Sequence, residues 1–388
     1  MSRRTERSDA GYSRQVVLLF CLTILVALFT LTGFLSRAFH QKEVAIAENW
    51  NERGNAALAA GHAREARDCY RNALIYEPQN TVYQLHLARA LAAFGRSDQS
   101  RAYLLNLLEQ LPGDGEINLD LARLAAQDRA VDAAIHYYHG AIYGAWDTKP
   151  VESRRAARLE LATFLVNHGQ NTQAEAELIA LAAGIPEDQA GMHAIVGQLF
   201  TKVGDLNRAL AEFEIALKVA PRNVDALAGA GTAAFRLQDY FRAAAYLERA
   251  LAERPEDADL KAKLEISRSI ISSDPFIANL TATERAHRAA LDLTRAVSRA
   301  EKCQGASSVK DAESPLATFL ARAKATRFSI WSERGLAEHP EQIPAAMRVA
   351  FGLESESDNS CGTAEGPDLA IDMIRDLHSD IAAGAMEK

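Results

Sequence analysis

The sequence is poor in cysteine and lacks the common motifs of enzymes and metal sites. It has four cysteines, and none of them forms a C-x-x-C pair or lies near histidine at the spacing of a zinc site. The motifs G-x-x-x-x-G-K-[ST], G-x-S-x-G and H-E-x-x-H are also missing. The formal net charge is -8, whereas a nucleic-acid partner requires a basic surface that neutralises phosphates. We therefore expect no enzyme, no metal or other cofactor, no nucleic-acid partner and no small-molecule substrate.

One uncharged apolar run stands out near the N-terminus. Residues 16–35, VVLLFCLTILVALFTLTGFL, contain no charge, and a helix of this length spans roughly 30 Å, the thickness of the hydrocarbon layer of a bilayer. A cleaved signal peptide is the alternative, but its apolar core is usually about 7–15 residues and ends at a small-x-small site. The segment at the end of the run, GFLSRAFH, offers no convincing site of this kind. We predict a transmembrane helix.

The basic residues around this run predict its orientation. Lys and Arg accumulate on the cytoplasmic side of a membrane span. Four arginines precede the run and two basic residues follow it closely: Arg3, Arg4, Arg7, Arg14, and then Arg37 and Lys42. This excess predicts a cytoplasmic tail at 1–15 and places the remaining chain on the far side. The opposite orientation stays open, because Glu6 and Asp9 make the bias modest.

A repeat of about 34 residues dominates the next 200 positions. Five prolines mark it, with separations of 34, 74, 35 and 34 residues: Pro78, Pro112, Pro186, Pro221 and Pro255. Twelve positions before four of them stands an alanine (Ala66, Ala174, Ala209, Ala243), and twenty-four positions before three of them stands a glycine (Gly54, Gly197, Gly231). This register predicts a helix–turn–helix unit in which small residues permit close helix contact and proline ends the second helix.

Further positions support the same unit. Larger apolar residues fill the space between units, at Tyr70, Leu104, Leu178, Phe213 and Leu247. The turns are predicted within AAGHAREA, AFGRSDQS, NHGQNTQA, KVGDLNRA and RLQDYFRA. Four of these five contain a glycine where the end of a helix favours positive φ.

These residues resemble the tetratricopeptide repeat (TPR). The first unit matches the family pattern at Trp50, Gly54, Ala66, Tyr70, Ala73 and Pro78. The resemblance implies an all-α fold, in which a transmembrane helix precedes a right-handed superhelix of about six repeats at 47–257. We predict units at 47–80, 81–114, 115–148, 155–188, 190–223 and 224–257.

The aromatic segment YYHGAIYGAW, at 137–146, lies in the second helix of the third unit. Tyr138 occupies a core position of the repeat, and Trp146 stands where other units have proline. We expect the additional rings to pack the irregular joint after this unit; a ligand-binding aromatic site is the alternative. His136 and His139 lie on one helical face, but we expect no metal there, because no third ligand is apparent.

Residues 258–388 keep a helical periodicity without the repeat. We interpret them as a small helical cap with flexible segments, predicted as loops at 304–312 and 354–367 because these are rich in Ser, Gly, Asp and Glu. Helices are predicted at 313–336, 341–354 and 367–383.

The cysteines fall into two groups. Cys21 lies in the apolar run and Cys69 at an apolar mid-helix position, whereas Cys303 and Cys361 have polar surroundings. In an oxidising compartment, Cys303 and Cys361 could form a disulfide. Such a bond closes a 58-residue loop, worth about 4 kcal/mol by chain entropy. Two unrelated free thiols are the alternative.

The resemblance also implies a binding surface. In TPR proteins the first helix of each unit lines a concave groove that binds helices or extended peptides. The candidate groove residues are Asn51 and the ninth residue of each unit: Asn55, Arg89, Arg123, Thr163, Gln198 and Thr232. Asn51 and Asn55 stand where family members with a carboxylate clamp carry lysine and asparagine, so the clamp is incomplete. Arg89 and Arg123 could still bind the carboxylates of an anionic segment. A solvated face without a ligand is the alternative.

The chain as a whole is similar to membrane-anchored TPR proteins of bacteria. It is predicted to be a single-pass protein of the bacterial inner membrane, with its C-terminal domain in the periplasm. We expect an interaction scaffold that binds a protein or peptide partner, as an assembly or accessory subunit of an envelope complex. The alternative is an accessory subunit whose C-terminal domain has thiol-redox or glycan-binding activity.

Overall fold

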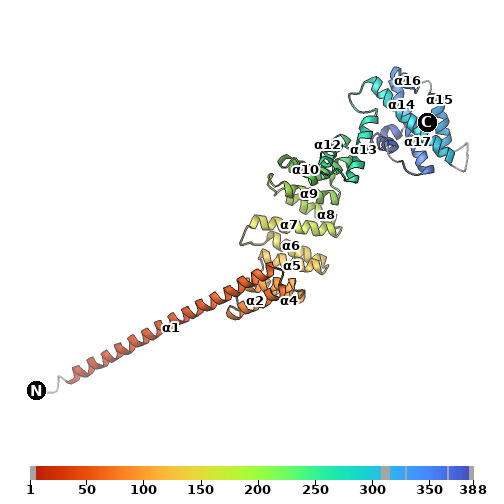
Figure 1. Cartoon of the computed structure of the whole chain (residues 1–388). Coiled ribbons are helices and arrows are strands. Elements are labelled where there is room, and N and C mark those ends of the chain that lie inside the picture. Colours follow the sequence, from red (N-terminus) through yellow and green to blue (C-terminus); the bar gives the residue numbers. More distant parts are fainter. Residues whose placement is uncertain (1–5, 307–314, 328–329, 365–366, 384–388) are drawn as a thin grey trace. The chain divides into compact units, whose positions relative to one another are not determined.

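The computed structural model of the chain describes residues 6–306, 315–327, 330–364 and 367–383, and helices make up nearly all of this part (Figure 1). Apart from helices, the described residues contain an isolated β-bridge between Asp114 and Ala145. The predicted all-α fold is therefore confirmed. The predicted N-terminal tail lies partly outside the described residues, as do positions 307–312 of the predicted loop 304–312.

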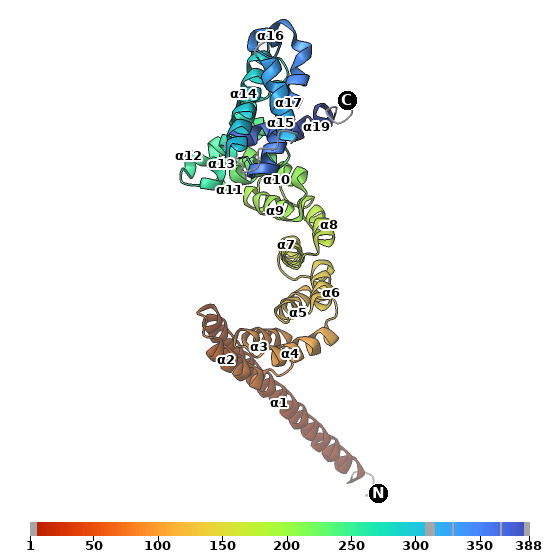
Figure 2. The ribbon, with the colours of Figure 1, turned by 90° about the vertical axis from the view of Figure 1, so that its right-hand side faces the viewer.

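The chain divides into two compact units, Met1–Phe164 and Leu165–Lys388. In the first unit each helix packs against the next one along the chain, from α1 to α6 (Figure 2). Its helices are α1 (Glu6–Ala59), α2 (Ala63–Tyr76), α3 (Thr81–Ala93), α4 (Ser97–Gln110), α5 (Gly115–Gln127) and α6 (Val131–Tyr143). Helix α7 (Pro150–Asn167) begins in the first unit and ends in the second.

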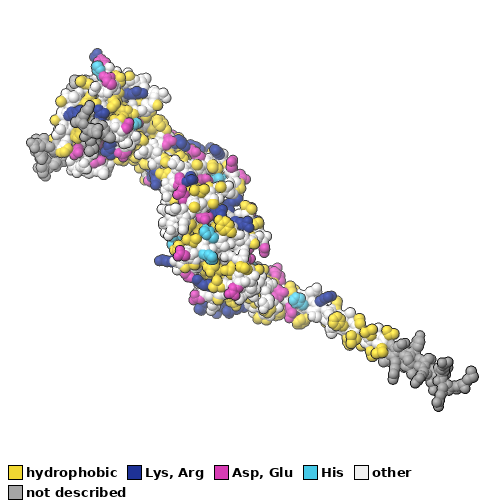
Figure 3. All heavy atoms as spheres, turned by 180° about the vertical axis from the view of Figure 1, so that it is seen from behind, with side chains coloured by type: hydrophobic (Ala, Val, Ile, Leu, Met, Phe, Trp, Pro, Cys, Tyr) yellow, Lys and Arg dark blue, Asp and Glu magenta, His cyan; other side chains and the backbone are white. Residues whose placement is uncertain are grey.

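Helix α1 contains the apolar run near the N-terminus. Among the described residues, its segment Leu18–Ala59 is the one helix that is long and apolar enough to cross a membrane. Leucine and phenylalanine side chains along it are exposed, and Figure 3 shows hydrophobic side chains on the described part of α1 that follows the grey end. The helix continues through Leu35 as far as Ala59. No loop therefore separates the apolar run from the first repeat.

The positions that the sequence marks as small lie at close helix contacts. Ala66, Ala174, Ala209 and Ala243 are completely buried. At Gly197 of the second unit, an added Cβ would lie 2.8 Å from the Phe213 ring, so these two helices approach closely because the glycine has no side chain. The predicted filling residues are 0–1% exposed: Tyr70, Leu104, Leu178, Phe213 and Leu247.

The turns inside the units also follow the sequence pattern. Glycine takes positive φ, between 71° and 94°, in four of the five predicted turns: Gly61, Gly95, Gly169 and Gly204. In the fifth turn, Gln238 adopts φ 62° instead. The last residue of several units caps the following helix: Asn80, Asp114, Asn223 and Asp257 each accept a hydrogen bond from a backbone amide three residues on.

The second unit continues the helix pairs and ends in a helical C-terminal region. Its repeat helices are α8 (Asn171–Ala182), α9 (Ala190–Val203), α10 (Leu206–Val219), α11 (Val224–Arg236) and α12 (Tyr240–Glu253), and α13 (Ala258–Ser273) follows them. The C-terminal helices are α14 (Ala282–Ala306), α15 (Pro315–Arg327), α16 (Glu333–Glu338), the 3-10 helix η1 (Pro340–Gln342), α17 (Ile343–Cys361), α18 (Pro367–Leu377) and α19 (Ser379–Ala383). Tyr240 and Ile270 share one hydrophobic core with Leu293 of α14, Phe351 of α17 and Ile374 of α18. The last repeat therefore packs directly into the C-terminal helices.

One predicted loop is wrong. The segment 354–367 was expected to be irregular because of its composition, but residues 354–361 form the last two turns of α17. Glu354 and Ser357 on these turns are completely buried. Contacts with α14, described below, hold this polar stretch in a helix.

Candidate functional site

The two candidate groove residues on α1 are engaged within the chain. Asn51 is 5% exposed, and its Oδ1 lies 2.8 Å from Nδ1 of His86 on α3. Asn55 accepts a hydrogen bond of 2.8 Å from the Tyr70 hydroxyl and remains exposed to solvent. Asn51 thus supports the contact between α1 and α3, whereas Asn55 is available to a partner.

Arg89 on α3 is held by two carboxylates of α5. Its Nε donates to Asp120 Oδ2 at 2.6 Å, and its Nη2 donates to Glu116 Oε2 at 2.9 Å. Burial opposes the charge of Arg89, but the two carboxylates outweigh this effect and raise its pKa. Arg89 therefore stays charged and is already paired.

Arg123 on α5 forms the same kind of pair with α7. Its Nε and Nη2 donate to the two carboxylate oxygens of Glu160 at 3.0 and 2.6 Å, in bidentate fashion. Its Nη1 lies 3.5 Å from Asp120 Oδ1. The hydrogen bonds to Glu160 raise the pKa of Arg123. The side chains of Arg123 and Glu160 are 47% and 35% exposed, so this pair is open to solvent.

Together these side chains form an arginine–carboxylate ladder, consisting of Arg89, Glu116, Asp120, Arg123 and Glu160. The ninth-residue row in the sequence contains the two arginines but not the three acids. The repeat register contains the missing signal, because Asp120 and Glu160 are each the sixth residue of a predicted unit. An arginine at the ninth position of one unit thus pairs with an acid at the sixth position of the next. With three acids and two arginines, an anionic ligand has to displace an internal carboxylate.

The other candidate groove residues are polar and unpaired. Thr163 lies on α7, Gln198 on α9 and Thr232 on α11. Gln198 is exposed, and the two threonines are half-buried. None of the three side chains hydrogen-bonds to another group in the described part of the chain. Gln198 and Thr232 belong to the second unit, so they are a separate row from the ladder.

The aromatic segment YYHGAIYGAW is used largely for packing. Tyr138 is buried. Trp146 lies against Gly115, where an added Cβ would collide with its indole ring, and its Nε1 donates to the Ala141 carbonyl at 2.8 Å. The Ala145 amide donates to the Gly113 carbonyl at 2.7 Å. Trp146 thus holds the end of α6 against the start of α5. Other units have a proline at this position.

The histidines of this segment do not form a metal site in the described residues. His136 contacts the ring of Tyr137 at 5.3 Å between centroids, and His139 contacts Tyr143 at 6.2 Å. Within the residues that the structure describes, no group of three or more His, Cys, Asp or Glu side chains could hold a metal ion.

A cavity of about 770 Å³ lies beside the first repeat, and the sequence analysis did not predict it. Arg53 stacks over the Trp50 ring at 4.3 Å, and both residues line this cavity with Cys69 and Phe94. Its remaining lining mixes both signs of charge, with Arg64, Glu65 and Asp68. The cavity therefore combines apolar and charged groups and carries no clear preference for one ligand charge.

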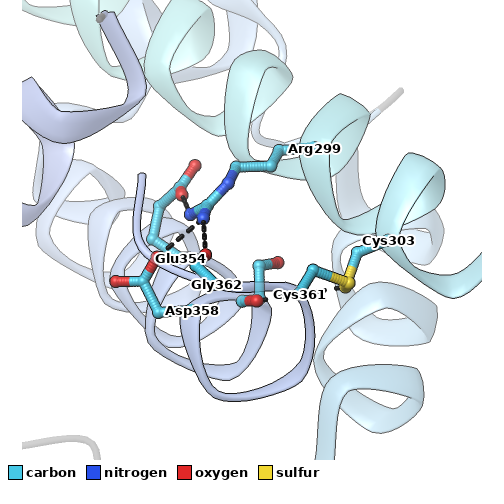
Figure 4. Close-up of a disulfide and its surroundings, with 7 residues drawn as sticks. Arg299, Cys303, Glu354, Asp358, Cys361 and Gly362 are labelled. Carbon is cyan, nitrogen blue, oxygen red and sulfur yellow. Dashed lines mark hydrogen bonds and ion pairs between the residues drawn. A yellow bond between two sulfur atoms is a disulfide. The ribbon is translucent and has the colours of Figure 1, made fainter. Parts of the chain in front are cut away.

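In the C-terminal region a disulfide joins Cys303 of α14 to Cys361 at the end of α17, with Cα atoms 5.9 Å apart (Figure 4). Close to it, Arg299 of α14 donates hydrogen bonds to Glu354, to Asp358 at 2.6 Å and to the Gly362 carbonyl at 2.7 Å. Both features connect α14 to the last turns of α17.

Several carboxylates around Arg299 are buried enough to resist ionisation. Burial raises the pKa of Glu354 to about 7, although Arg299 favours its charged form. Burial likewise raises the pKa of Asp372 on α18 to about 6 and that of Asp292 on α14 to about 7. One carboxylate oxygen each of Asp292 and Glu354 is buried without a hydrogen-bond partner in the described part of the chain. Each of these three acids has an arginine within 3.5 Å, and burial outweighs these pairings in setting its pKa.

Comparisons with known proteins identify the class of the repeats. Two family models described as tetratricopeptide repeat match residues 57–117 and 197–258. The chain is thus an all-helical repeat protein, and it contains tetratricopeptide repeats in both of its compact units. The boundaries predicted for the six individual units and for the C-terminal region remain predictions. No curated protein matches the sequence.

Solved structures of other TPR proteins are similar at low sequence identity. YrrB, described as a TPR protein with an unusual peptide-binding site, is 17% identical; the match covers 49% of this chain and 94% of that chain, with a TM-score of 0.40. PilW, described as a widely conserved type IV pilus biogenesis factor, is 19% identical, with coverages of 56% and 97% and a TM-score of 0.42. PilF of Pseudomonas aeruginosa is 14% identical, with coverages of 57% and 97% and a TM-score of 0.43.

Proposed function

We propose that the chain is a membrane-anchored interaction scaffold that binds a protein partner along the first helices of its repeats. The residues 16–35 would anchor it in the bacterial inner membrane, with the repeats and the C-terminal region in the periplasm. In this setting it would serve as an assembly or accessory subunit of an envelope complex. It would perform no chemistry, and its action would be to concentrate the partner at the membrane.

The observation that carries the proposal is the exposed pair between Arg123 and Glu160. An ion pair with this much solvent contact contributes about 0–1 kcal/mol, so a partner can open it at little cost. The guanidinium of Arg123 then offers a planar pair of donors that fits a carboxylate in bidentate fashion. A carboxylate of the partner would replace that of Glu160, and the Glu160 side chain would rotate out into the solvent. We therefore expect a partner segment that carries acidic residues.

Other polar groups on first helices would add to binding. Asn55 and Thr163 lie in the first unit with the ladder, whereas Gln198 and Thr232 form a separate row in the second unit. Polar side chains of this kind satisfy the backbone of an extended peptide or the polar face of a helix.

A crosslinked pull-down of the full-length protein from native membranes tests the proposal. Arg123→Glu should lose the partner that the wild type captures. Glu160→Gln should capture more of it, because the partner no longer has to break the ion pair between Arg123 and Glu160. Arg101→Glu is the matched control: Arg101 forms an ion pair with Asp128, which shares no residue with the ladder, and this variant should behave as wild type.

Two results of this pull-down would contradict the proposal. Capture by Arg123→Glu at the wild-type level would show that the ladder is not the binding surface. Reduced capture by Glu160→Gln would show that Glu160 itself contacts the partner, which reverses the expected charge of the segment. Circular dichroism of each variant establishes that helical content is unchanged.

The orientation is tested separately with reporter fusions after residue 388. Alkaline phosphatase is active only when it is exported, and green fluorescent protein fluoresces when it remains in the cytoplasm. An active phosphatase fusion supports the periplasmic placement. A fluorescent fusion without phosphatase activity would move the scaffold, and its partner, into the cytoplasm.

The second candidate function concerns the C-terminal region, as an accessory subunit with thiol-redox or glycan-binding activity. A redox-active pair needs an accessible thiol of low pKa; Cys361 is exposed, but it is bonded to Cys303, which is only 5% exposed. We therefore favour a structural disulfide. Alkylation of the native protein after mild reductant separates the two: rapid labelling of both cysteines supports redox activity, and labelling only after denaturation supports a structural bond.

A further inference from the structure

Helix α1 connects the apolar run to the first repeat without a break (Figure 1). Between Leu35, the last residue of the run, and Ala47, the first buried residue after it, the sequence contains neither glycine nor proline. Residues 36–42 are exposed, so this segment is a spacer that stands clear of the repeats. Because a helix without a kink has a fixed rise per residue, the spacer sets the distance between the run and the repeats.

Contacts between α1 and α3 define the level of the ladder along this helix. On α3, the hydroxyl of Tyr83 and the ring of His86 each bond to the α1 residue 35 positions earlier, at 2.7 and 2.8 Å. The two helices therefore run side by side with a constant offset. Arg89 on α3 is thus level with residue 54, which lies about 28 Å along α1 from Leu35.

The rest of the ladder lies at a similar level. Glu116 and Asp120 contact Arg89 directly, and Arg123, about one turn further along α5, pairs with Glu160. All five residues belong to the first compact unit. The ladder therefore lies about 28–33 Å beyond the apolar run. Lipid headgroups occupy only about 5–8 Å on each side of a bilayer, so a segment bound at the ladder lies outside the headgroup layer.

The ladder alone offers a partner little free energy. A carboxylate that replaces Glu160 exchanges one exposed ion pair for another, and such pairs contribute about 0–1 kcal/mol. An acidic segment that diffuses freely would therefore bind weakly. Confinement of both proteins to one membrane raises their effective concentration, and it does so most when the spacer matches the distance between the two sites. A spacer of fixed length gives this advantage to a partner in the same membrane and not to a soluble one.

We infer that the ladder binds an acidic segment of a second protein embedded in the same membrane, and that α1 sets the height at which this segment must lie. The inference rests on the proposed anchor and ladder, and it goes beyond them by naming the class of partner. An extended chain covers 28 Å in about 8 residues, and a helix does so in about 19. The acidic residues of the partner therefore lie no closer than about 8 residues to its own transmembrane segment, on the same side of the membrane as the repeats.

Defined probes, reconstituted with the full-length protein in phosphatidylcholine vesicles, test the inference. Each probe is a leucine-rich transmembrane helix followed by a Gly/Ser spacer, a glutamate and a photoreactive residue. Spacers of about 4, 10 and 16 residues place the glutamate at most about 18, 39 and 60 Å from the transmembrane helix. The two longer probes should crosslink to the wild type, and the shortest should crosslink at least tenfold less.

An insertion in α1 then changes the height of the ladder. One helical heptad, EAAAKEA, inserted after Gln41 moves Arg123 from about 33 to about 43 Å and rotates the repeats by only about 20°. The probe with the intermediate spacer should lose at least tenfold in crosslinking, because it no longer reaches. The probe with the longest spacer should stay within about twofold of its wild-type yield, which also shows that the inserted protein is folded.

The contradicting results separate this inference from the proposed function. A soluble peptide with the same glutamate and photoreactive residue should crosslink at least tenfold less than the intermediate probe. Equal crosslinking of that peptide, or an insertion that leaves the intermediate probe unaffected, would overturn the inference while the ladder proposal stands. If the ladder itself is not the binding surface, Arg123→Glu will crosslink every probe as the wild type does, and the inference falls with it.

Discussion

Replacement of Arg299 by methionine should strongly destabilise the contact between α14 and α17. The side chain of Arg299 is 15% exposed, that of Glu354 is fully buried and that of Asp358 is 24% exposed. Methionine preserves most of the aliphatic volume but leaves the buried Glu354 without its counter-ion. Breaking a buried pair in this way costs about 3–5 kcal/mol. Since Glu354 has a raised pKa and can take up a proton, we expect the lower end, about 3 kcal/mol.

Hydrogen exchange of the full-length protein in detergent, followed by mass spectrometry, measures this effect locally. A loss of about 3 kcal/mol corresponds to roughly 100-fold faster exchange of the protected amides of α14 and α17. Arg268→Met provides the control, because Arg268 pairs with Glu248 at 58% and 51% exposure and should cost less than about 1 kcal/mol.

A compensating variant separates charge from packing. Changing Glu354 to leucine together with Arg299→Met removes the stranded carboxylate and should recover at least half of the lost protection, because replacing both members of a buried pair by apolar groups is often nearly neutral. The reasoning would be refuted if Arg299→Met accelerated exchange in α14 and α17 no more than Arg268→Met does.

Three further predictions concern stability. Burial raises the pKa of both Glu354 and Asp292 to about 7. Their protonated forms therefore stabilise the fold at low pH, and this stabilisation is lost between about pH 4, where both groups ionise in the unfolded chain, and pH 7. The urea midpoint of the C-terminal region should be lower at pH 8 than at pH 5, and a higher midpoint at pH 8 would contradict this. Cys303→Ser should destabilise the same region by about 4 kcal/mol, given the 58-residue loop, and an unchanged midpoint under non-reducing conditions would argue against the bond. Trp146→Ala should cost about 2–3 kcal/mol, because the half-buried ring packs on α5, whereas Tyr143→Ala, at a side chain 73% exposed, should stay within about 0.5 kcal/mol; equal effects would mean that the segment does not brace the joint.

The repeat architecture could be predicted because its signals are local and periodic. Alanine and glycine recur where helices touch, and positive φ recurs at turn glycines such as Gly61 and Gly204. The residue type at each such position is determined by a local need for close helix contact or for positive φ, and this need recurs in each unit. At Gln238, where the glycine is missing, the backbone keeps the same left-handed conformation, so neighbouring helices impose the turn without it.

The helix predicted at 341–354 corresponds to most of α17, but its last two turns could not be predicted because their stability depends on distant residues. Residues 354–361 have the composition of a loop, and an isolated helix of this kind is unstable in water. Arg299 and Cys303, more than 50 positions earlier, hold it in place. No pattern within the segment reports those contacts.

The candidate site was predicted in part for the same reason. The repeat register placed Arg89 and Arg123 on first helices. Predicting their pairing with Asp120 and Glu160 also requires knowing how the first helices of adjacent units align. The irregular joint after the third unit, with its six extra residues, hid the second of these pairs.

The central claim is that a protein partner binds along the first helices of the repeats. In-cell photo-crosslinking tests it most directly, with a photoreactive amino acid placed at Gln198 on α9 or Thr163 on α7, and at Tyr103 on α4 as the control on a second helix. The account predicts one protein crosslinked from Gln198 or Thr163 and not from Tyr103. A partner crosslinked from Tyr103 alone, or equally from all three positions, would contradict it.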